Sequence, residues 1–226
     1  MHEAHDRIIR YREEDEAMEI APEDLPWQSV YKILIGSVVP RPIGWISTVN
    51  SAGRPNLAPF SFFNAVCANP PHVLFCPSVR IEDCQPKDSL HNVRATGEFV
   101  VNIVTEELAE AMNLTSTDLP ADVNEFEIAG LAVSPSSAVR PPRVAASPIH
   151  YECKVVHILE LGDQPGAGKV VVGRIVHLHV DDSVLFGGDK IDLAKLKPVG
   201  RLGGNGYCRV TDLFKMVRPP SQIKAE

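Results

Sequence analysis

Short apolar runs rich in Val, Ile and Phe recur along the chain, and turns rich in glycine and proline separate them. Their length and composition are typical of β-strands. We therefore predict strands over Ile43–Asn50, Leu57–Cys67, Val73–Cys76, Glu98–Val104, Ile149–Leu161, Lys169–Val184 and Tyr207–Met216. Residues 51–55 and 162–168 have the composition of hairpin connections, so the strands that flank each of them are expected to pair antiparallel.

Helical patterns interrupt this series of strands. We expect helices over Ser29–Ser37, Lys87–Gly97 and Thr105–Leu114, and a helical turn within Asp122–Leu131. Asp88 or Ser89 can cap the second of these helices, and Gly97 can end it in the left-handed conformation. Thr105 can cap the third. Because strands and helices do not alternate regularly, the order favours an antiparallel β-barrel with appended helices over a doubly wound parallel sheet.

The composition suits a globular chain with one core. Hydrophobic residues make up 44% of the 226 positions, and the formal net charge is −7. Residues 1–25 are polar and acidic, so we expect them to form an extension, with residues 26–226 as a single domain. The negative charge disfavours nucleic acid and anionic membranes as partners. The charged N-terminus lacks the apolar segment of a signal peptide, and no apolar run of about 18 residues occurs.

The five cysteines are scattered and include no Cys-x-x-Cys pair. We interpret Cys67, Cys76, Cys84, Cys153 and Cys208 as reduced thiols that mostly serve as buried packing residues. Reduced thiols and the missing signal peptide indicate a cytoplasmic protein.

Common nucleotide and metal motifs do not fit this chain. The cluster Gly200–Gly206 lacks the Gly-x-Gly-x-x-Gly spacing and precedes a strand, and Gly162–Lys169 departs from a P-loop by one residue. His177 and His179 share one face of a predicted strand, but no third ligand lies nearby in the sequence, so we predict no metal site. No histidine accompanies a recognisable Ser or Cys nucleophile motif, and we predict no catalytic side chain.

The stretch 40–48 places polar and aromatic side chains among apolar ones. Apolar walls with a few polar groups are typical of sites for flat, partly polar cofactors. Arg41 lies between two prolines and is either a ligand contact or a turn residue in a salt bridge. Trp45 either stacks on a ring or packs in the core.

The return segment after the turn at 51–55 carries a second group of candidates. Ser61, Phe63 and Asn64 would line a pocket, whereas Phe60 and Phe62 would point the other way, because side chains alternate along a strand.

Lys87-Asp88-Ser89 combines a cation, a hydroxyl and the start of a predicted helix. Backbone N–H groups and the helix dipole at such a start attract a terminal phosphate. Asn92, one turn later, can add a hydrogen bond. The alternative is a capped helix with a solvated lysine.

Eight segments in this order match one known family. They are Pro40–Thr48, Ser61–Asn64 with Asn69–Pro71, Lys87–Ser89, Phe99–Asn102, Asn124–Leu131, Pro148–Cys153, Val171–Val176 and Gly200–Tyr207. On these segments the chain resembles the flavin reductase-like family, whose members have the FMN-binding split-barrel fold. The resemblance implies a mainly β fold with inserted helices, a split β-barrel of antiparallel strands, bound FMN, and a homodimer with the flavin where two subunits meet.

The resemblance also assigns individual contacts. It implies contact with FMN for Arg41, Trp45, Ser47, Thr48, Ser61, Phe62, Phe63 and Asn64. Lys87 and Ser89 would hold the phosphate, with Asn92 in support, and Arg201 and Tyr207 would lie near the flavin ring.

The implied activity is hydride transfer from NADH or NADPH, as a transient donor, to bound FMN. Electrons would then pass to a free flavin, an iron complex, a quinone or a partner oxygenase. Because the cofactor carries this chemistry, no side chain has to act as acid or base. Two alternatives stay open: a non-catalytic FMN carrier or sensor, and an oxidase of the pyridoxamine phosphate oxidase type, which would need a second phosphate site.

Overall fold

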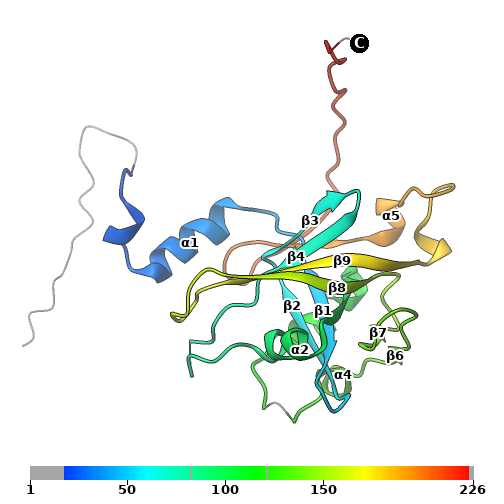
Figure 1. Ribbon diagram of the computed structural model, residues 1–226. Coiled ribbons are helices and arrows are strands. Elements are labelled where there is room, and N and C mark those ends of the chain that lie inside the picture. The colour runs from blue at the N-terminus through cyan, green and yellow to red at the C-terminus, as the bar shows by residue number, and fades with distance from the viewer. Residues whose placement is uncertain (1–17, 82, 121, 224–226) are drawn as a thin grey trace, which may run out of the picture.

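A seven-stranded antiparallel sheet forms the body of the molecule in the computed structural model, which describes residues 18–81, 83–120 and 122–223 (Figure 1). Across the sheet the strand order is β2-β1-β5-β8-β9-β4-β3. These strands are β1 (Gly44–Val49), β2 (Pro55–Phe60), β3 (Phe63–Ala68), β4 (Pro71–Phe75), β5 (Glu98–Ile103), β8 (Ile149–Glu160) and β9 (Lys169–Val180). Two short hairpins pair β6 (Val133–Ser134) with β7 (Arg143–Val144) and β10 (Val199–Arg201) with β11 (Tyr207–Arg209). The predicted mainly antiparallel β fold is confirmed.

The two edge strands of this sheet are neighbours in the chain. β2 and β3 stand at opposite ends of the strand order, yet only Ser61 and Phe62 separate them. The three Cα steps from Phe60 to Phe63 span at most roughly 11 Å. The sheet therefore has to curl until its two edges approach each other, which produces the barrel-like shape.

The predicted single strand over Leu57–Cys67 is wrong, because the chain turns after Phe60 and β3 pairs with β4. Two contacts accompany the turn. The Arg41 Nε donates to Ser61 Oγ over 3.2 Å, and the Phe63 ring lies against the backbone of Gly44. A Cβ added at Gly44 would lie 2.5 Å from Phe63 Cδ2, so the close approach requires glycine there.

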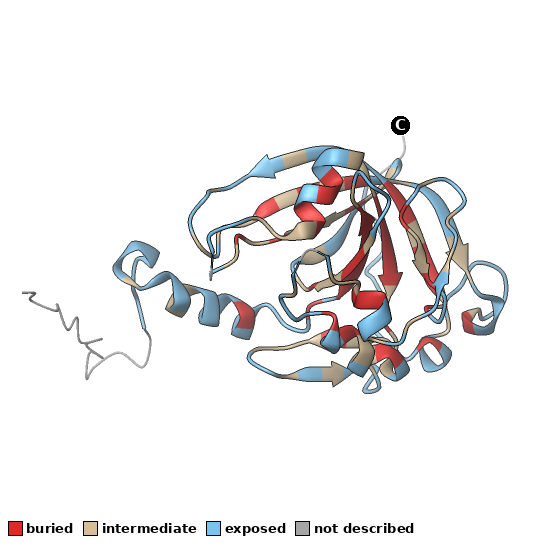
Figure 2. Ribbon diagram, turned by 90° about the horizontal axis from the view of Figure 1, so that it is seen from below, coloured by how far each residue is buried: buried red, intermediate tan, exposed pale blue. Residues whose placement is uncertain are grey.

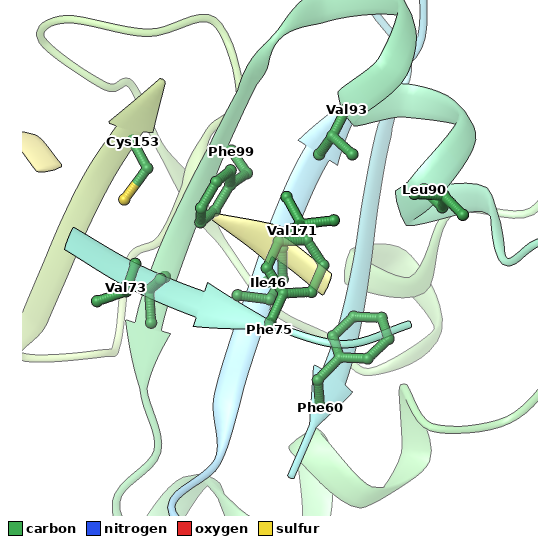
Figure 3. Close-up of a cluster of buried hydrophobic side chains, with 10 residues drawn as sticks. Ile46, Phe60, Val73, Phe75, Leu90, Val93, Phe99, Cys153 and Val171 are labelled. Carbon is green, nitrogen blue, oxygen red and sulfur yellow. The ribbon is translucent and has the colours of Figure 1, made fainter. Parts of the chain in front are cut away.

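The curled sheet encloses one hydrophobic cluster, to which β1, β2, β4, β5, β8, β9 and one helix contribute (Figure 3). Phe75 lies near its centre, with ring centroids 5.1 Å from Phe60 and 5.0 Å from Phe99. A second cluster covers the other face of β1 and includes Trp45, Met112 and Phe126. Because β1 packs against both clusters, all six of its residues are buried.

Helices lie around the sheet. They are η1 (Pro22–Asp24), α1 (Trp27–Ser37), α2 (Asp88–Thr96), η2 (Glu106–Leu108), α3 (Ala109–Leu114), α4 (Glu125–Ile128), η3 (Asp182–Val184) and α5 (Leu193–Leu196). α2 packs through Leu90 and Val93 on the cluster that the curled sheet encloses, which we call the inner cluster. None of the helices in the described ranges is long and apolar enough to cross a membrane.

The helix ends agree with the predictions only in part. Gly97 ends α2 with φ 69°, in the left-handed region, as expected. The predicted cap of α2 is wrong, because Lys87 is its N-cap. Thr105 is the N-cap residue of η2 as expected, but its side chain makes no cap hydrogen bond. Asp88 and Ser89 both lie inside the helix, so their side chains are available for other contacts.

The ends of the described chain are more exposed than its centre. α1 projects away from the sheet, and Ile35 is the one residue of it classed as buried (Figure 2). The predicted last strand is shorter than expected: β11 ends at Arg209, and residues 210–223 form no further strand. Most of the predicted extension over residues 1–25 lies outside the described residues.

The cysteines are free thiols, but the prediction that they mostly serve as buried packing residues is wrong. Cys67 and Cys84 are exposed, Cys76 and Cys208 are half-buried, and Cys153 alone of the five is buried. Burial raises the pKa of the Cys153 thiol, so this side chain stays protonated in the inner cluster.

Candidate functional site

A hollow opens between β2, the start of α2 and the loop that follows α3. We call it the β2–α2 hollow. It is lined by Asn56, Ala58, Pro59, Phe60, Arg80, Lys87, Asp88, Ser89, Thr115, Ser116, Thr117, Asp118, Leu119 and Glu125. A second hollow shares Asn56, Asp88 and Glu125 with it and extends toward Asn92 and Arg54. The region therefore joins an apolar wall on β2 to charged groups at the start of α2.

A chain of buried polar side chains forms the floor of the β2–α2 hollow. Thr48 faces Asn56 across the β1–β2 pair, and its hydroxyl lies 3.3 Å from Asn56 Oδ1. Asn92 donates to Thr48 Oγ1 over 2.9 Å, and Ser89 donates to Asn56 Oδ1 over 3.1 Å. Ser89 and Asn92 are three residues apart, so both lie on the face of α2 that meets the hairpin. Three predicted site residues thus meet in one network.

Glu125 completes this floor from α4. Its carboxylate is largely buried and accepts hydrogen bonds from Asn56 Nδ2 at 2.9 Å and from the Leu57 amide at 3.1 Å. These two donors compensate the cost of burying the charge. The network therefore fixes the β2 wall relative to α2 and α4.

Two cations stand at the rim of the hollow, and carboxylates accompany both. The Lys87 Nζ lies 2.8 Å from Asp118 Oδ1. Arg80 donates from Nε and Nη2 to the two carboxylate oxygens of Asp83, at 3.0 and 2.7 Å, and its Nη1 is 3.9 Å from Asp88 Oδ2. The hydrogen bond from Arg80 lowers the pKa of the Asp83 carboxyl. Cations and carboxylates thus lie side by side around the anion-attracting start of α2.

Arg41 lies at the other end of the β1–β2 hairpin, in a different environment. It is buried, and its guanidinium donates to the carbonyls of Ile35 at 2.7 Å, Val38 at 3.0 Å and Leu202 at 2.9 Å, besides Ser61. We call these five residues the Arg41 cluster. It joins the end of α1, the β2–β3 turn and the segment after β10. Burial, and then the charge of Arg201, lower the pKa of Arg41, but the guanidinium keeps its charge.

Arg201 and Tyr207 lie beside the Arg41 cluster on β10 and β11. The backbones of Arg41 and Arg201 exchange two hydrogen bonds of 2.9 Å. The Arg201 guanidinium carbon lies 4.5 Å from the centroid of the Tyr207 ring, and the Tyr207 hydroxyl donates to Asn113 Oδ1 over 3.1 Å. Neither residue lines the β2–α2 hollow.

Trp45 and Ser47 point away from the hollow. They face the side of β1 that carries the second hydrophobic cluster, which we call the outer cluster. Trp45 is fully buried there, which leaves its ring no free face. Its Nε1 donates over 2.9 Å to Thr115 Oγ1, and Thr115 does line the hollow. Ser47 donates to the carbonyl of Pro142. Both side chains therefore lie on the face of β1 opposite the hollow, where they support the residues around it.

The return segment is arranged differently from the sequence expectation. Phe60, expected to point away, lines the hollow and packs in the inner cluster. Phe63 packs on Gly44, while Phe62 and Asn64 are exposed near the β3 edge. The turn between β2 and β3 breaks the alternation on which the expectation depended.

The sequence reasoning missed several residues that build the hollow. Asn56 had a detectable signal, because hairpin pairing places it opposite Thr48. Glu125 lies in one of the segments that carry the family resemblance. Arg80, Thr115 and Asp118 lie in loops, where no periodic pattern indicates which side chains converge.

Two histidines of the long β8–β9 hairpin, one on each strand, form a pair. His150 Nδ1 lies 3.2 Å from His179 Nδ1, and His150 Nε2 bonds to the Val144 carbonyl at 2.9 Å. In the ranges 18–81, 83–120 and 122–223, no three His, Cys, Asp or Glu side chains gather as metal ligands.

Comparison with known proteins places this arrangement in a family. Residues 35–191 match the family model described as "Flavin reductase like domain". Nitrilotriacetate monooxygenase component B from Bacillus cereus is 33% identical, with a TM-score of 0.83 over 89% of this chain and all of that chain. The 2-nitrobenzoate 2-nitroreductase of Pseudomonas fluorescens is also 33% identical, with a TM-score of 0.79 over 90% of this chain and 99% of that chain. A structure from Shewanella frigidimarina with a split barrel domain, 24% identical with a TM-score of 0.76 over 90% of this chain and all of that chain, confirms the predicted fold type.

Proposed function

Because the chain belongs to the flavin reductase-like family, we propose that it binds FMN and acts as an NAD(P)H-dependent oxidoreductase. The observation that carries the proposal is the β2–α2 hollow, which joins the apolar residues Ala58, Pro59 and Phe60 of β2 to Lys87 at the start of α2 and to Arg80 in a loop. An apolar wall suits an aromatic ring system, and cations beside a helix start suit a phosphate. The residues present therefore fit FMN.

The proposed contacts divide between direct and supporting roles. Lys87 and Arg80 would hold the phosphate, and the β2 wall would face the ring system. Ser89 is almost fully buried and already donates to Asn56, so it would support the floor unless its hydroxyl turns toward the ligand. Thr48 and Asn92 belong to the same floor. Trp45 would act through Thr115.

Bound FMN would supply the two-electron redox chemistry. The task left to this chain is to orient the ring and keep one of its faces open to the nicotinamide. The network of Thr48, Asn56 and Glu125 would hold the β2 wall rigid for this purpose, because every hydrogen bond in it joins two different elements. A rigid wall favours catalysis, since hydride transfer requires the reacting atoms about 3–3.5 Å apart.

An anaerobic titration tests the proposed activity. Protein reconstituted with FMN is mixed rapidly with NADH or with NADPH, and the flavin absorbance near its visible maximum is followed. We expect rapid bleaching with at least one of the two donors. Protein that binds FMN but is reduced by neither donor would be a carrier or sensor, and protein that binds no FMN would contradict the whole proposal.

A screen of acceptors would then identify the second half of the reaction. Free flavin is the first acceptor to test, in view of the similarity to a monooxygenase component B. Nitroaromatic acids form a second class, which the equal identity to a 2-nitrobenzoate 2-nitroreductase favours. Re-oxidation of the reduced protein by 2-nitrobenzoate, but not by benzoate, would support the second class.

We also propose a homodimer. Apolar residues of α1 and of the segment just after it are exposed in the single chain, among them Tyr31 at 47%, Leu34 at 47% and Val38 at 58%. A second subunit would remove this surface from water, which supports the proposal. Light scattering coupled to gel filtration measures the mass directly, and a monomer at micromolar concentration would contradict it.

A further inference from the structure

We propose that Asp118 competes with the flavin phosphate for Lys87, so that FMN exchanges with free flavin instead of staying permanently bound. This inference rests on the proposed FMN site. It concerns a residue of the loop after α3 and assigns it a role in setting affinity and specificity.

The first step is the contact itself. The Asp118 carboxylate lies 2.8 Å from the Lys87 ammonium, and both side chains line the β2–α2 hollow. Lys87 is also the N-cap residue of α2, so its position is fixed by the start of that helix. A phosphate that approaches this helix start would meet an ammonium group that already has an anionic partner.

The second step is that the loop is held in place. Thr115 is buried and accepts the hydrogen bond from Trp45, while its hydroxyl donates to the Met112 carbonyl over 2.8 Å. The Ser116 hydroxyl donates over 2.6 Å to the carbonyl of Asn113. Asp118 stands only three residues beyond Thr115, so the anchored base of the loop keeps its carboxylate close to α2.

The third step concerns the other cation. Arg80 has two hydrogen bonds to Asp83 and faces Asp88 at 3.9 Å. A phosphate would therefore meet two cations whose charge a carboxylate already partly neutralises, and it would lie close to those carboxylates. The net gain is the difference between two charge-assisted interactions, not the full strength of one.

The consequence for function is an exchangeable flavin. The β2 wall contributes to binding whether or not the ligand carries a phosphate, whereas the Lys87–Asp118 pair reduces the advantage of FMN over riboflavin. A reductase with such a site would release its reduced flavin. A separate reaction, which consumes free reduced flavin, would then take it up.

The experiment compares Asp118→Asn with the unmodified protein. Dissociation constants for FMN and for riboflavin are measured by quenching of flavin fluorescence, and FMN release is timed after dilution into excess apoprotein. We expect Asp118→Asn to bind FMN about two- to fivefold more tightly and to release it more slowly, with riboflavin affinity unchanged. Asp122→Asn is the control: it removes the same charge from the same loop at a residue outside the lining, and we expect no change.

A double variant separates competition from a structural effect. In a Lys87→Gln background, Asp118→Asn should bring no selective gain for FMN, because the contested cation is gone. Equal FMN affinities of Asp118→Asn and the unmodified protein would overturn the inference, and so would an equal shift for FMN and riboflavin. Asp118→Ser serves as a second variant and should give the same selective gain. Failure of every variant to bind either flavin would instead contradict the proposed function.

Discussion

Two cationic side chains, Arg41 and Lys87, lie near the two ends of the β1–β2 hairpin, and they differ in burial and in their hydrogen-bond partners. The pair Gly44–Phe60 is the one nearer Arg41, whereas the pair Thr48–Asn56 belongs to the floor of the β2–α2 hollow, which extends along β2 as far as Phe60. Gly44 and Thr48 are four positions apart along β1, or roughly 13 Å. Arg41 is buried and donates to three backbone carbonyls and one hydroxyl, whereas the Lys87 side chain is 27% exposed and has one carboxylate partner.

The difference shows which cation can serve a ligand. Arg41 ties the end of α1 to Ser61 and to Leu202, so a ligand that captured its guanidinium would leave the buried Ile35 carbonyl and the partly buried Leu202 carbonyl without a donor. Lys87 can leave Asp118 at little cost, because exposed ion pairs contribute about 0–1 kcal/mol. The resemblance implied FMN contact for both residues, and from these contacts we propose a supporting role for Arg41 and a direct role for Lys87.

Replacing Arg41 should have the largest effect on stability. We expect Arg41→Met to lower the free energy of unfolding by about 3 kcal/mol, because the carbonyls of Ile35, Val38 and Leu202 lose their donor. Urea unfolding followed by tryptophan fluorescence measures this loss. Lys87→Met is the matched control and should change the unfolding free energy by less than about 0.5 kcal/mol. Equal losses for the two variants would remove the distinction between the two ends.

A pH titration provides a second comparison, between Arg41 and another buried basic group. Burial lowers the pKa of His150 to about 4, although its bond to the Val144 carbonyl acts in the opposite direction. His150 is therefore neutral in the folded protein at pH 7, whereas Arg41 stays charged. In the unfolded chain an ordinary histidine takes up its proton near pH 6.5.

The sign of the His150 effect follows from these two pKa values. Between about pH 6.5 and 4 the unfolded state binds more protons than the folded state, so stability falls as the pH falls, by about 3 kcal/mol in total. We expect the unfolding free energy of His150→Asn to lack this part of the decline. Parallel pH curves for the two proteins would show that His150 is not the group responsible.

The fold could be predicted largely from local pattern. The antiparallel hairpin β8–β9 was visible as two β-rich runs around a glycine-rich turn, and Gly97 marked the end of α2. The break between β2 and β3 could not be predicted, because it depends on Phe63 packing against Gly44 and on Arg41 reaching Ser61. Both contacts join residues about 20 positions apart, and no local propensity encodes them.

Changing one acid in the floor of the hollow should have an intermediate effect. In Glu125→Gln, an amide NH₂ would replace one of the oxygens that accept from Asn56 and from the Leu57 amide. We expect a loss of about 2 kcal/mol in the free energy of unfolding, because a buried donor would lose its acceptor. Glu127→Gln, an exposed change on the same helix, should cost less than about 0.5 kcal/mol. Wild-type stability of Glu125→Gln would show that the network contributes little rigidity.

The site could be predicted only in outline. Thr48, Ser89 and Asn92 do converge, because strand pairing and helical spacing bring them together. Trp45 shows the opposite case: its residue type suits both ring stacking and core packing, and the sequence does not reveal that β1 is covered on both faces. Loop residues such as Asp118 carry no periodic signal at all.

Replacing Lys87 should have the smallest effect, and one confined to ligand binding. We expect Lys87→Ala to weaken FMN about tenfold and riboflavin hardly at all, because riboflavin lacks the phosphate that a charge-assisted hydrogen bond would hold. Fluorescence titrations with both flavins measure the difference, and Lys190→Ala, an exposed lysine outside the hollow, serves as the control. The expected factor is small because part of the lysine's attraction is already satisfied by Asp118. A loss of both flavins together would place Lys87 with Arg41 among the structural cations, and an unchanged FMN affinity would move the phosphate away from the start of α2.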